Sequence, residues 1–160
     1  MVTQERLKEL FDYQDGTFIR RSTGIKIVAN FGGKRYLRVF VDGKPRSLHR
    51  MIYIWHYGIP KNNIDHIDGD RANNKIENLR EATQQQNCLN RKHHSNSKSP
   101  YKNVCRAAAS ENSNWKRNWV VSVNVAGKRK YIGSFEDLEL ADLVAAEARN
   151  KFQGQFARHF

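Results

Sequence analysis

The chain of 160 residues carries a net charge of +12, with 39% hydrophobic and 11% aromatic residues. This apolar content is enough for small hydrophobic cores, which argues against a wholly disordered chain. No apolar run reaches the roughly 18 residues that a membrane span needs, and the charged amino-terminal sequence lacks the pattern of a signal peptide. Two cysteines, Cys88 and Cys105, are too few for a disulfide scaffold or a four-cysteine zinc site. Such a basic chain favours a polyanionic partner, most often nucleic acid.

Residues 1–60 predict a basic leader. A helical pattern covers residues 5–11, and a strand pattern covers residues 17–20. Apolar and polar residues alternate over residues 37–41, which is typical of a half-buried strand, and Asp42-Gly43 is a strong hairpin signal. Ser47 is a candidate cap for a helix that ends at Gly58. Four basic residues of this region are candidates for contacts with a phosphate backbone: Arg35, Arg38, Lys44 and Arg46.

Residues 61–96 concentrate acidic residues within this basic chain. Carboxylates repel a polyanion, so their presence needs a reason, and metal binding is one. The pattern predicts a strand at 64–67, a loop rich in Gly, Asp and Asn, a short element at 76–79 and a polar helix from about 84 to 93. The acidic residues are Asp65, Asp68, Asp70, Glu77 and Glu81.

Asp65 and His66 are adjacent on the predicted strand. A histidine can take a proton from water near neutral pH, because its pKa lies close to the working pH. A carboxylate supplies the oxygen ligands that Mg²⁺ prefers. Neighbouring strand residues, however, point to opposite faces of the sheet. An isolated Asp-His pair also more often has a structural role than a catalytic one. The pair therefore becomes informative only together with the residues that follow it.

The run DHIDGDRANNKIENLREATQQQN, residues 65–87, resembles the HNH nuclease motif of phage and intron-encoded homing endonucleases. His66, Asn78 and Asn87 occupy its three named positions, at spacings of 12 and 9 residues. The resemblance implies a ββα-metal fold in which His66 is the general base. It also implies that Asp65 and Asn87 bind one divalent metal ion per active site, Mg²⁺ or Mn²⁺. Asn78 would bridge the loop and hold the orientation of His66.

Other polar residues near this motif are interpreted as structural. Asp68, Asp70 and Asn74 fit tight turns with side-chain hydrogen bonds to the backbone. His49 is interpreted as a packing or capping residue of the helix before the motif rather than as a second base. The leader itself resembles the segment usually found before this type of HNH motif.

Residues 97–160 predict a separate sheet and helix after a linker at 93–100. Strands are expected near 101–106, 119–125 and 128–133, and an Ala-rich helix from about 138 to 151. Alternation places Trp119, Val121, Val123 and Val125 on the face toward the helix. It places Val120, Ser122 and Asn124 on the opposite, outward face, together with Arg129 and Tyr131 of the neighbouring strand.

Tyr101–Val104, Trp119, the Gly133-x-Phe135 turn and the Ala-rich helix resemble the APETALA/ethylene-response-factor DNA-binding domain over about residues 97–160. This resemblance implies a three-stranded antiparallel sheet packed on one helix, with the outward face in the DNA major groove. Asn103 stands where that family usually has Gly. The candidate DNA-binding residues are Lys102, Arg106, Ser122, Asn124, Arg129 and Tyr131, with Lys116, Arg117 and Lys128 nearby.

These patterns together predict an α+β protein with a leader at 1–60, an HNH nuclease core at 61–96 and an APETALA-type domain at 97–160. The predicted function is metal-dependent hydrolysis of phosphodiester bonds in double-stranded DNA, as a nick or a double-strand break, by a monomer or homodimer. The alternatives are a non-catalytic DNA-binding regulator that uses the carboxy-terminal domain, and a basic RNA-binding protein. We expect no small-molecule substrate and no membrane partner. The expected location is the cytoplasm, of the host cell if the protein is phage-encoded.

Overall fold

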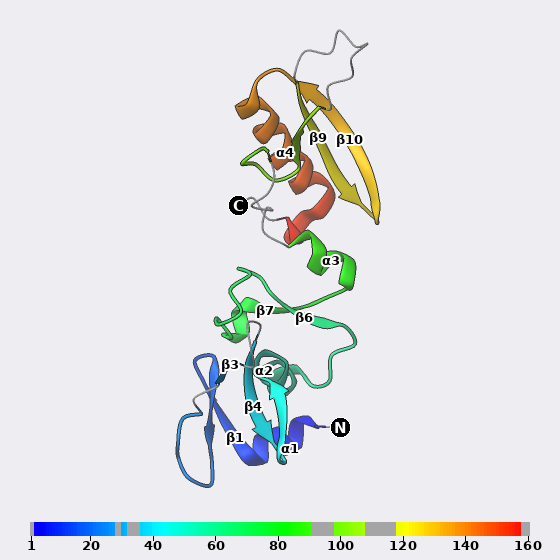
Figure 1. Ribbon diagram of the computed structural model, residues 1–160. Coiled ribbons are helices and arrows are strands. Elements are labelled where there is room, and N and C mark those ends of the chain that lie inside the picture. The colour runs from blue at the N-terminus through cyan, green and yellow to red at the C-terminus, as the bar shows by residue number, and fades with distance from the viewer. Residues whose placement is uncertain (1, 28–29, 32–35, 91–97, 108–117, 158–160) are drawn as a thin grey trace. The chain divides into compact units, whose positions relative to one another are not determined.

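The computed structural model describes residues 2–27, 30–31, 36–90, 98–107 and 118–157 (Figure 1). The chain forms two compact units, Met1–Gln84 and Gln85–Phe160. Both combine helices with small antiparallel sheets, which confirms the predicted α+β class. No helix in the described part of the chain is long and apolar enough to cross a membrane. The candidate phosphate contacts Arg35, Lys116 and Arg117 lie outside the described residues.

The first unit is assembled from short helices and small antiparallel sheets. β1 pairs with β2, β4 pairs with both β3 and β5, and β6 pairs with β7. Its elements are α1 (Gln4–Leu10), β1 (Phe11–Gln14), β2 (Thr17–Arg20), β3 (Asn30–Phe31), β4 (Leu37–Val41), β5 (Lys44–Ser47), α2 (Leu48–Tyr57), β6 (Asn63–His66), η1 (Ile76–Asn78) and β7 (Leu79–Ala82).

Helix α1 ends one residue earlier than the sequence pattern predicts, because Phe11 begins a strand. Phe11 pairs with Arg20 across the β1–β2 hairpin, and its ring stacks on Phe18 with centroids 5.0 Å apart. Asp15 and Gly16 close this hairpin with φ angles of +42° and +81°. Two consecutive positive φ angles are typical of the type I′ turn that Asp-Gly favours. The strand at 11–14 was missed because its first residue continued the helical apolar pattern.

Helix α2 is held mainly by packing. Ser47 stands at its amino-terminal cap, as predicted, but the Ser47 side chain makes no capping hydrogen bond. The helix ends where predicted, since the N–H of Gly58 donates to the carbonyl oxygen of Ile54 at 2.9 Å. Its buried side chains contribute Leu48, Met51, Ile52 and Ile54 to the core of the first unit.

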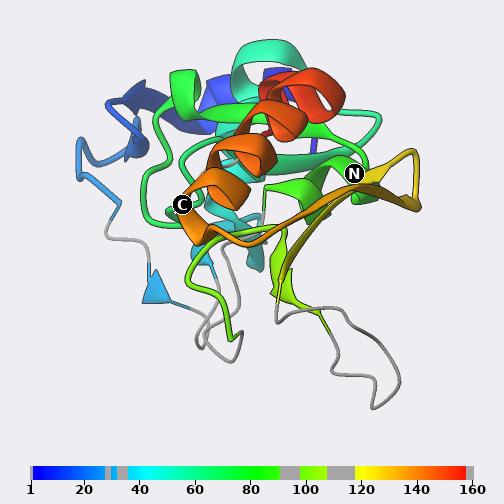
Figure 2. The ribbon, with the colours of Figure 1, turned by 90° about the horizontal axis from the view of Figure 1, so that it is seen from above.

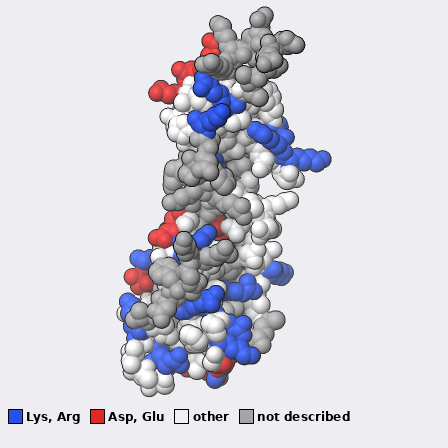
Figure 3. Space-filling model, viewed as in Figure 1, with Lys and Arg blue, Asp and Glu red and all other residues white. Residues whose placement is uncertain are grey.

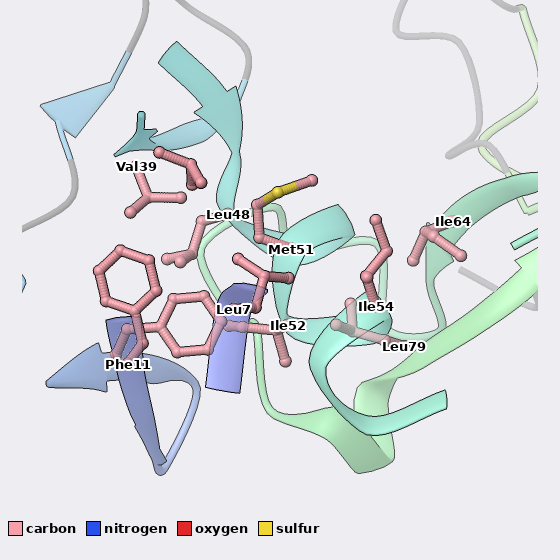
Figure 4. Packing of buried hydrophobic residues seen from close by; sticks show 11 residues of the cluster. Leu7, Phe11, Val39, Leu48, Met51, Ile52, Ile54, Ile64 and Leu79 are labelled. Atoms are coloured by element: carbon pink, nitrogen blue, oxygen red, sulfur yellow. The ribbon is translucent and has the colours of Figure 1, made fainter. Parts of the chain in front are cut away.

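One hydrophobic core joins the leader to the strands of the HNH-like motif (Figure 4). The leader contributes residues from α1, β1, β2, β4 and α2, and β6 and β7 contribute Ile64 and Leu79. Burial of a large apolar side chain stabilises a fold by roughly 1.5–3 kcal/mol. The strands that carry the candidate site are therefore fixed by the leader. The buried set is Leu7, Phe11, Phe18, Val39, Val41, Leu48, Met51, Ile52, Ile54, Ile64 and Leu79.

The second unit packs a helix on a three-stranded antiparallel sheet of order β10-β9-β8. Figures 1 and 2 both show α4 running along the β9–β10 hairpin. Val121 and Val123 are fully buried, as the predicted alternation requires, and Ala141 and Ala145 of α4 are buried too. The elements are α3 (Gln84–Leu89), β8 (Val104–Arg106), β9 (Trp119–Val125), β10 (Lys128–Phe135), α4 (Leu138–Gln153) and η2 (Gly154–Phe156). The predicted extension of α3 to residue 93 falls partly outside the described residues.

The β1–β2 turn packs directly on the loop of the HNH-like motif. The Tyr13 hydroxyl oxygen accepts hydrogen bonds from the N–H of Gly16 at 3.0 Å and from the N–H of Ile76 at 3.1 Å. Lys75 Nζ lies 3.0 Å from Asp15 Oδ1. A Cβ at Gly16 would lie 3.1 Å from the backbone N of Lys75. Gly16 is therefore required both for its positive φ and for the close approach of two backbones.

Gly16→Ala is expected to destabilise the first unit more than Gly43→Ala does. Both glycines have positive φ in an Asp-Gly turn, which costs alanine about 1–2 kcal/mol. Nothing lies within 4 Å of a Cβ at Gly43, whereas Gly16 meets backbone atoms, so we expect about 1–3 kcal/mol more at Gly16. Urea unfolding followed through the amide NMR signals of β1 and β2 measures both variants. Equal losses in the two variants would contradict the packing of this turn on the loop.

Candidate functional site

Asp65 and His66 end strand β6 as adjacent buried polar side chains. Asp65 is 7% exposed and His66 is 4% exposed. Asp65 lies opposite Arg80 of β7 in the antiparallel ladder, and His66 lies opposite Leu79. Buried polar groups are costly unless they find partners, and neighbouring strand residues must find them on opposite faces.

The partner of Asp65 comes from the neighbouring strand. Arg80 donates hydrogen bonds from Nε and Nη2 to Asp65 Oδ2, at 3.3 and 3.2 Å. The guanidinium compensates the buried carboxylate charge and fixes the direction of its oxygens. Sequence reasoning missed Arg80. The strand register could have identified Arg80. An antiparallel pairing that places His66 opposite Leu79 also places Asp65 opposite Arg80.

The hydrogen-bond partner of His66 is an asparagine of the following loop. His66 Nε2 lies 3.0 Å from Asn74 Oδ1, and Asn74 is 2% exposed. The His66 ring also packs against two leader residues: its centroid lies 5.0 Å from that of His49 and 6.2 Å from that of Tyr36. Asn74 is therefore more than the turn residue that the sequence pattern predicts.

His49 belongs to this ring cluster. Its ring packs on those of His66 and Tyr36, and its Nδ1 atom is buried with no hydrogen-bond partner among the described residues. Burial, and then electrostatic interactions with His66 and Arg50, lower the pKa of His49 to about 4. His49 therefore packs as a neutral ring at neutral pH, in line with its interpretation as a packing residue. Its position against His66 was not predicted.

Asn78 bridges the loop between the two strands of the motif. Its Oδ1 accepts from the N–H of Asp68 at 3.0 Å. Its Nδ2 donates to Asp68 Oδ1 at 2.9 Å and to the carbonyl oxygen of Asn73 at 2.8 Å. The amide thus ties the start of the loop to its end, and the side chain on His66 Nε2 is Asn74 rather than Asn78.

Asp68 is the acceptor at the centre of this loop. It accepts from the N–H of Asp70 at 2.8 Å and from Asn73 Nδ2 at 2.7 Å, besides Asn78. Burial raises the pKa of Asp68, but the hydrogen bonds from Asn73, Asn78 and Asp70 outweigh it and hold the pKa below its usual value. Asp68 and Asp70 therefore have the turn roles expected from Asx-rich loops.

The second predicted metal ligand, Asn87, lies on α3 in the second unit, where it is half-buried. Its part at the site stays a prediction. Within the described ranges, no three His, Cys, Asp or Glu side chains form a group that could hold a metal ion. Among the described residues, Asp65 could supply a carboxylate oxygen to a metal here, with amide, water or phosphate oxygens completing the set.

The outer face of the second unit's sheet brings together four of the predicted DNA-binding residues. The ladder pairs Arg129 with Asn124 and Tyr131 with Ser122, so all four side chains lie on one face. Arg129 Nε donates to Ser122 Oγ at 2.7 Å, which leaves Ser122 buried while Tyr131 is 60% exposed. The result is an exposed surface with a guanidinium at its centre.

Two other predicted DNA-binding residues lie apart from this face. Arg106 pairs with Trp119, and its guanidinium carbon lies 5.5 Å from the Trp119 ring centroid. Trp119 packs against the core of the second unit, so Arg106 lies on the helix side of the sheet. Lys102 donates from Nζ to the carbonyl oxygen of Leu89 at 2.5 Å. Its ammonium group is therefore already held by the backbone.

Asn103 keeps the turn before β8 in a glycine-like conformation. Its φ is +69°, and its Nδ2 donates to the carbonyl oxygen of Ser122 at 2.9 Å. Asparagine is among the residues that tolerate this left-handed region best. The replacement of the expected glycine is thus accommodated by a hydrogen bond to the next strand.

The low pKa of His49 makes the stability of the first unit depend on pH. The unfolded chain binds a proton at His49 below about pH 6.5 and the folded chain only near pH 4, so stability falls as the pH drops through this window. We expect wild type to lose about 1–2 kcal/mol more than His49→Phe between about pH 7 and pH 5. Urea unfolding at both pH values measures the difference. Parallel losses would show that His49 is not buried as a neutral ring.

The chain is similar to known proteins in two comparisons. Residues 46–89 match the family model described as HNH endonuclease. Over 119 residues, the chain is 32% identical to Protein 3.8 of Escherichia phage T7, in an alignment that covers 71% of this chain and 91% of that protein. No solved structure matches. The matched region 46–89 includes α2, β6, β7 and α3, and thus His49, Asp65, His66, Asn74 and Asn78.

Proposed function

Because the chain belongs to the family of Protein 3.8 of Escherichia phage T7 and contains an HNH endonuclease domain at residues 46–89, we propose that it is a metal-dependent DNA endonuclease of the homing type. Its substrate would be double-stranded DNA, cut as a nick or as a double-strand break. The observation that carries the proposal is the pair of buried side chains, Asp65 and His66, at the end of β6 within the HNH match. A buried carboxylate beside a buried imidazole supplies an ion ligand and a base at adjacent positions.

His66 is the proposed general base. In this role a neutral imidazole accepts a proton from the water that attacks phosphorus. The scissile phosphodiester would then give a 5′-phosphate and a 3′-hydroxyl. Aromatic rings from the leader, His49 and Tyr36, limit the movement of the base.

The proposed metal ligands are the carboxylate of Asp65 and the amide oxygen of Asn87. An all-oxygen set with one carboxylate fits Mg²⁺ or Mn²⁺, which take their remaining ligands from water and substrate phosphate. When bound, the ion would supply positive charge that stabilises the leaving 3′ oxygen. Arg80 holds one carboxylate oxygen of Asp65 and so fixes how the other is directed.

Binding to DNA is proposed to use the basic surface of both units. Lys and Arg side chains lie on the visible face of each unit in Figure 3, and the whole chain has a net charge of +12. In the second unit the proposed reading face is that of Ser122, Asn124, Arg129 and Tyr131. Arginine and asparagine can form paired hydrogen bonds with base edges, whereas lysine chiefly contacts phosphate. The same exposed face supports the alternative, a non-catalytic DNA-binding regulator.

His66→Ala is expected to abolish metal-dependent cleavage of supercoiled plasmid and to leave DNA binding intact. Loss of a general base lowers the rate by about 10²–10⁴-fold. His56→Ala is the matched control, because His56 is a half-buried histidine of the same unit whose ring contacts are with Tyr13, Trp55 and Tyr57. Cleavage with Mg²⁺ and with EDTA, and binding by mobility shift, are measured for each variant. No cleavage of plasmid or of a site library by folded, DNA-binding wild type would favour the regulator.

Arg129→Ala is expected to weaken DNA binding by about 1–3 kcal/mol, because a guanidinium on the reading face is lost. Lys130→Ala removes the same charge from the neighbouring residue, whose ammonium lies 4.3 Å from the Phe152 ring centroid on the helix side. The control should therefore lose much less affinity. Fluorescence anisotropy with a duplex at fixed salt compares them. Equal losses would mean that net charge alone, and not this face, determines binding.

A further inference from the structure

We propose that Asn74 is the positioning residue that fixes the tautomer and the orientation of His66. The inference rests on the proposed function, in which His66 is the general base. It assigns a role to a residue whose sequence context indicates only a turn. The argument depends on how the Asn74 amide is oriented, on what that orientation requires of the His66 ring, and on what holds Asn74 in place.

The orientation of the Asn74 amide is set by its own nitrogen. Asn74 Nδ2 donates to the carbonyl oxygen of Ala72 at 3.1 Å. A carbonyl oxygen can only accept, so the NH₂ group must face Ala72. The amide oxygen then faces His66 Nε2, 3.0 Å away. A flipped amide would place two oxygens against each other at Ala72.

An amide oxygen on Nε2 selects one tautomer of the neutral imidazole. The oxygen only accepts hydrogen bonds, so Nε2 carries the proton and donates it to Asn74. The lone pair of the ring then lies on Nδ1, and this nitrogen becomes the proton acceptor. In the proposed reaction the proton of the attacking water would go to Nδ1 of His66. Asn74 thereby decides which nitrogen works as the base.

Burial makes this hydrogen bond effective. Asn74 and His66 are 2% and 4% exposed, so water competes poorly for either partner. The ring planes of Tyr36 and His66 lie within 15° of each other, and His49 packs at 56° to His66. Packing of this kind restricts the tilt of the ring, while the bond to Asn74 restricts its rotation.

The backbone that carries Asn74 is anchored by the leader. The Tyr13 hydroxyl accepts from the N–H of Ile76, and Gly16 approaches Asn74 so closely that a Cβ there would lie 3.2 Å from the Asn74 carbonyl carbon. Asn78 also donates to the carbonyl oxygen of Asn73, the preceding residue. Asn78 thus acts on His66 through the loop, and Asn74 touches the ring itself.

The test compares Asn74→Leu, which removes the acceptor at similar size, with Asn74→Asp, which keeps an oxygen acceptor. Cleavage under saturating DNA should fall about 10–100-fold in the Leu variant with unchanged DNA affinity. The Asp variant keeps an acceptor for Nε2 but loses the hydrogen bond to Ala72, so it should retain more of the rate than the Leu variant does. In ¹⁵N-histidine NMR spectra recorded without metal, His66 should show the Nε2–H tautomer in wild type and lose it in the Leu variant. The His66→Ala spectrum identifies the signals.

Asn73→Ala is the control for simple loosening of the loop, because Asn73 bonds to Asp68 and not to His66. It should keep the Nε2–H tautomer. An Asn74→Leu variant that cleaves at the wild-type rate, or that keeps the tautomer of His66, would overturn the inference while leaving the nuclease proposal intact. A wild type that binds DNA but never cleaves would overturn both.

Discussion

Two adjacent polar side chains buried at the end of one strand set the main constraint on this structure. Asp65 and His66 point to opposite faces of β6, so no single neighbour can satisfy both. Arg80 of the paired strand forms hydrogen bonds with the Asp65 carboxylate, and Asn74 of the loop forms one with the His66 imidazole. An unpaired partner would cost several kcal/mol in either place. The strand register brings Arg80 to Asp65, and the loop conformation brings Asn74 to His66. The packing of the leader holds both arrangements in place.

The leader supports the strands and the loop that carry Asp65, His66 and Asn74. Its core residues bury Ile64 and Leu79 of β6 and β7, and its β1–β2 turn supports the backbone at Asn74 through Tyr13 and Gly16. The rings of His49 and Tyr36 come from the leader too. A motif of about thirty residues has too little apolar surface to hold two buried polar groups by itself. The first unit therefore joins leader and motif in one core.

The sequence predicted the secondary-structure elements better than the side-chain contacts between them. Alternation, the Asp42-Gly43 turn and Gly58 correctly predicted β4, the β4–β5 turn and the end of α2, and alternation also predicted the strands of the second unit. The strand at 11–14 was missed, because an apolar residue at position 11 fits the periodicity of a helix and that of a strand equally well. Arg80 and Asn74 were missed for another reason. Their roles depend on strand register and on the direction of an amide, and neither has a periodic signal in the chain.

The same reasoning separates the candidate residues of the second unit. Sequence alternation placed Ser122 and Asn124 on the outward face of β9, together with Arg129 and Tyr131 of the neighbouring strand, and the ladder confirms that these four residues share a face. It places Arg106 with Trp119 on the other side, a result that the three-residue strand β8 was too short to predict. Arg129 bonds to Ser122, so its guanidinium is already held in a fixed position before any ligand arrives. A group held in this way loses less side-chain entropy on binding than a free lysine does, and Arg129 therefore has the strongest physical case for reading a base.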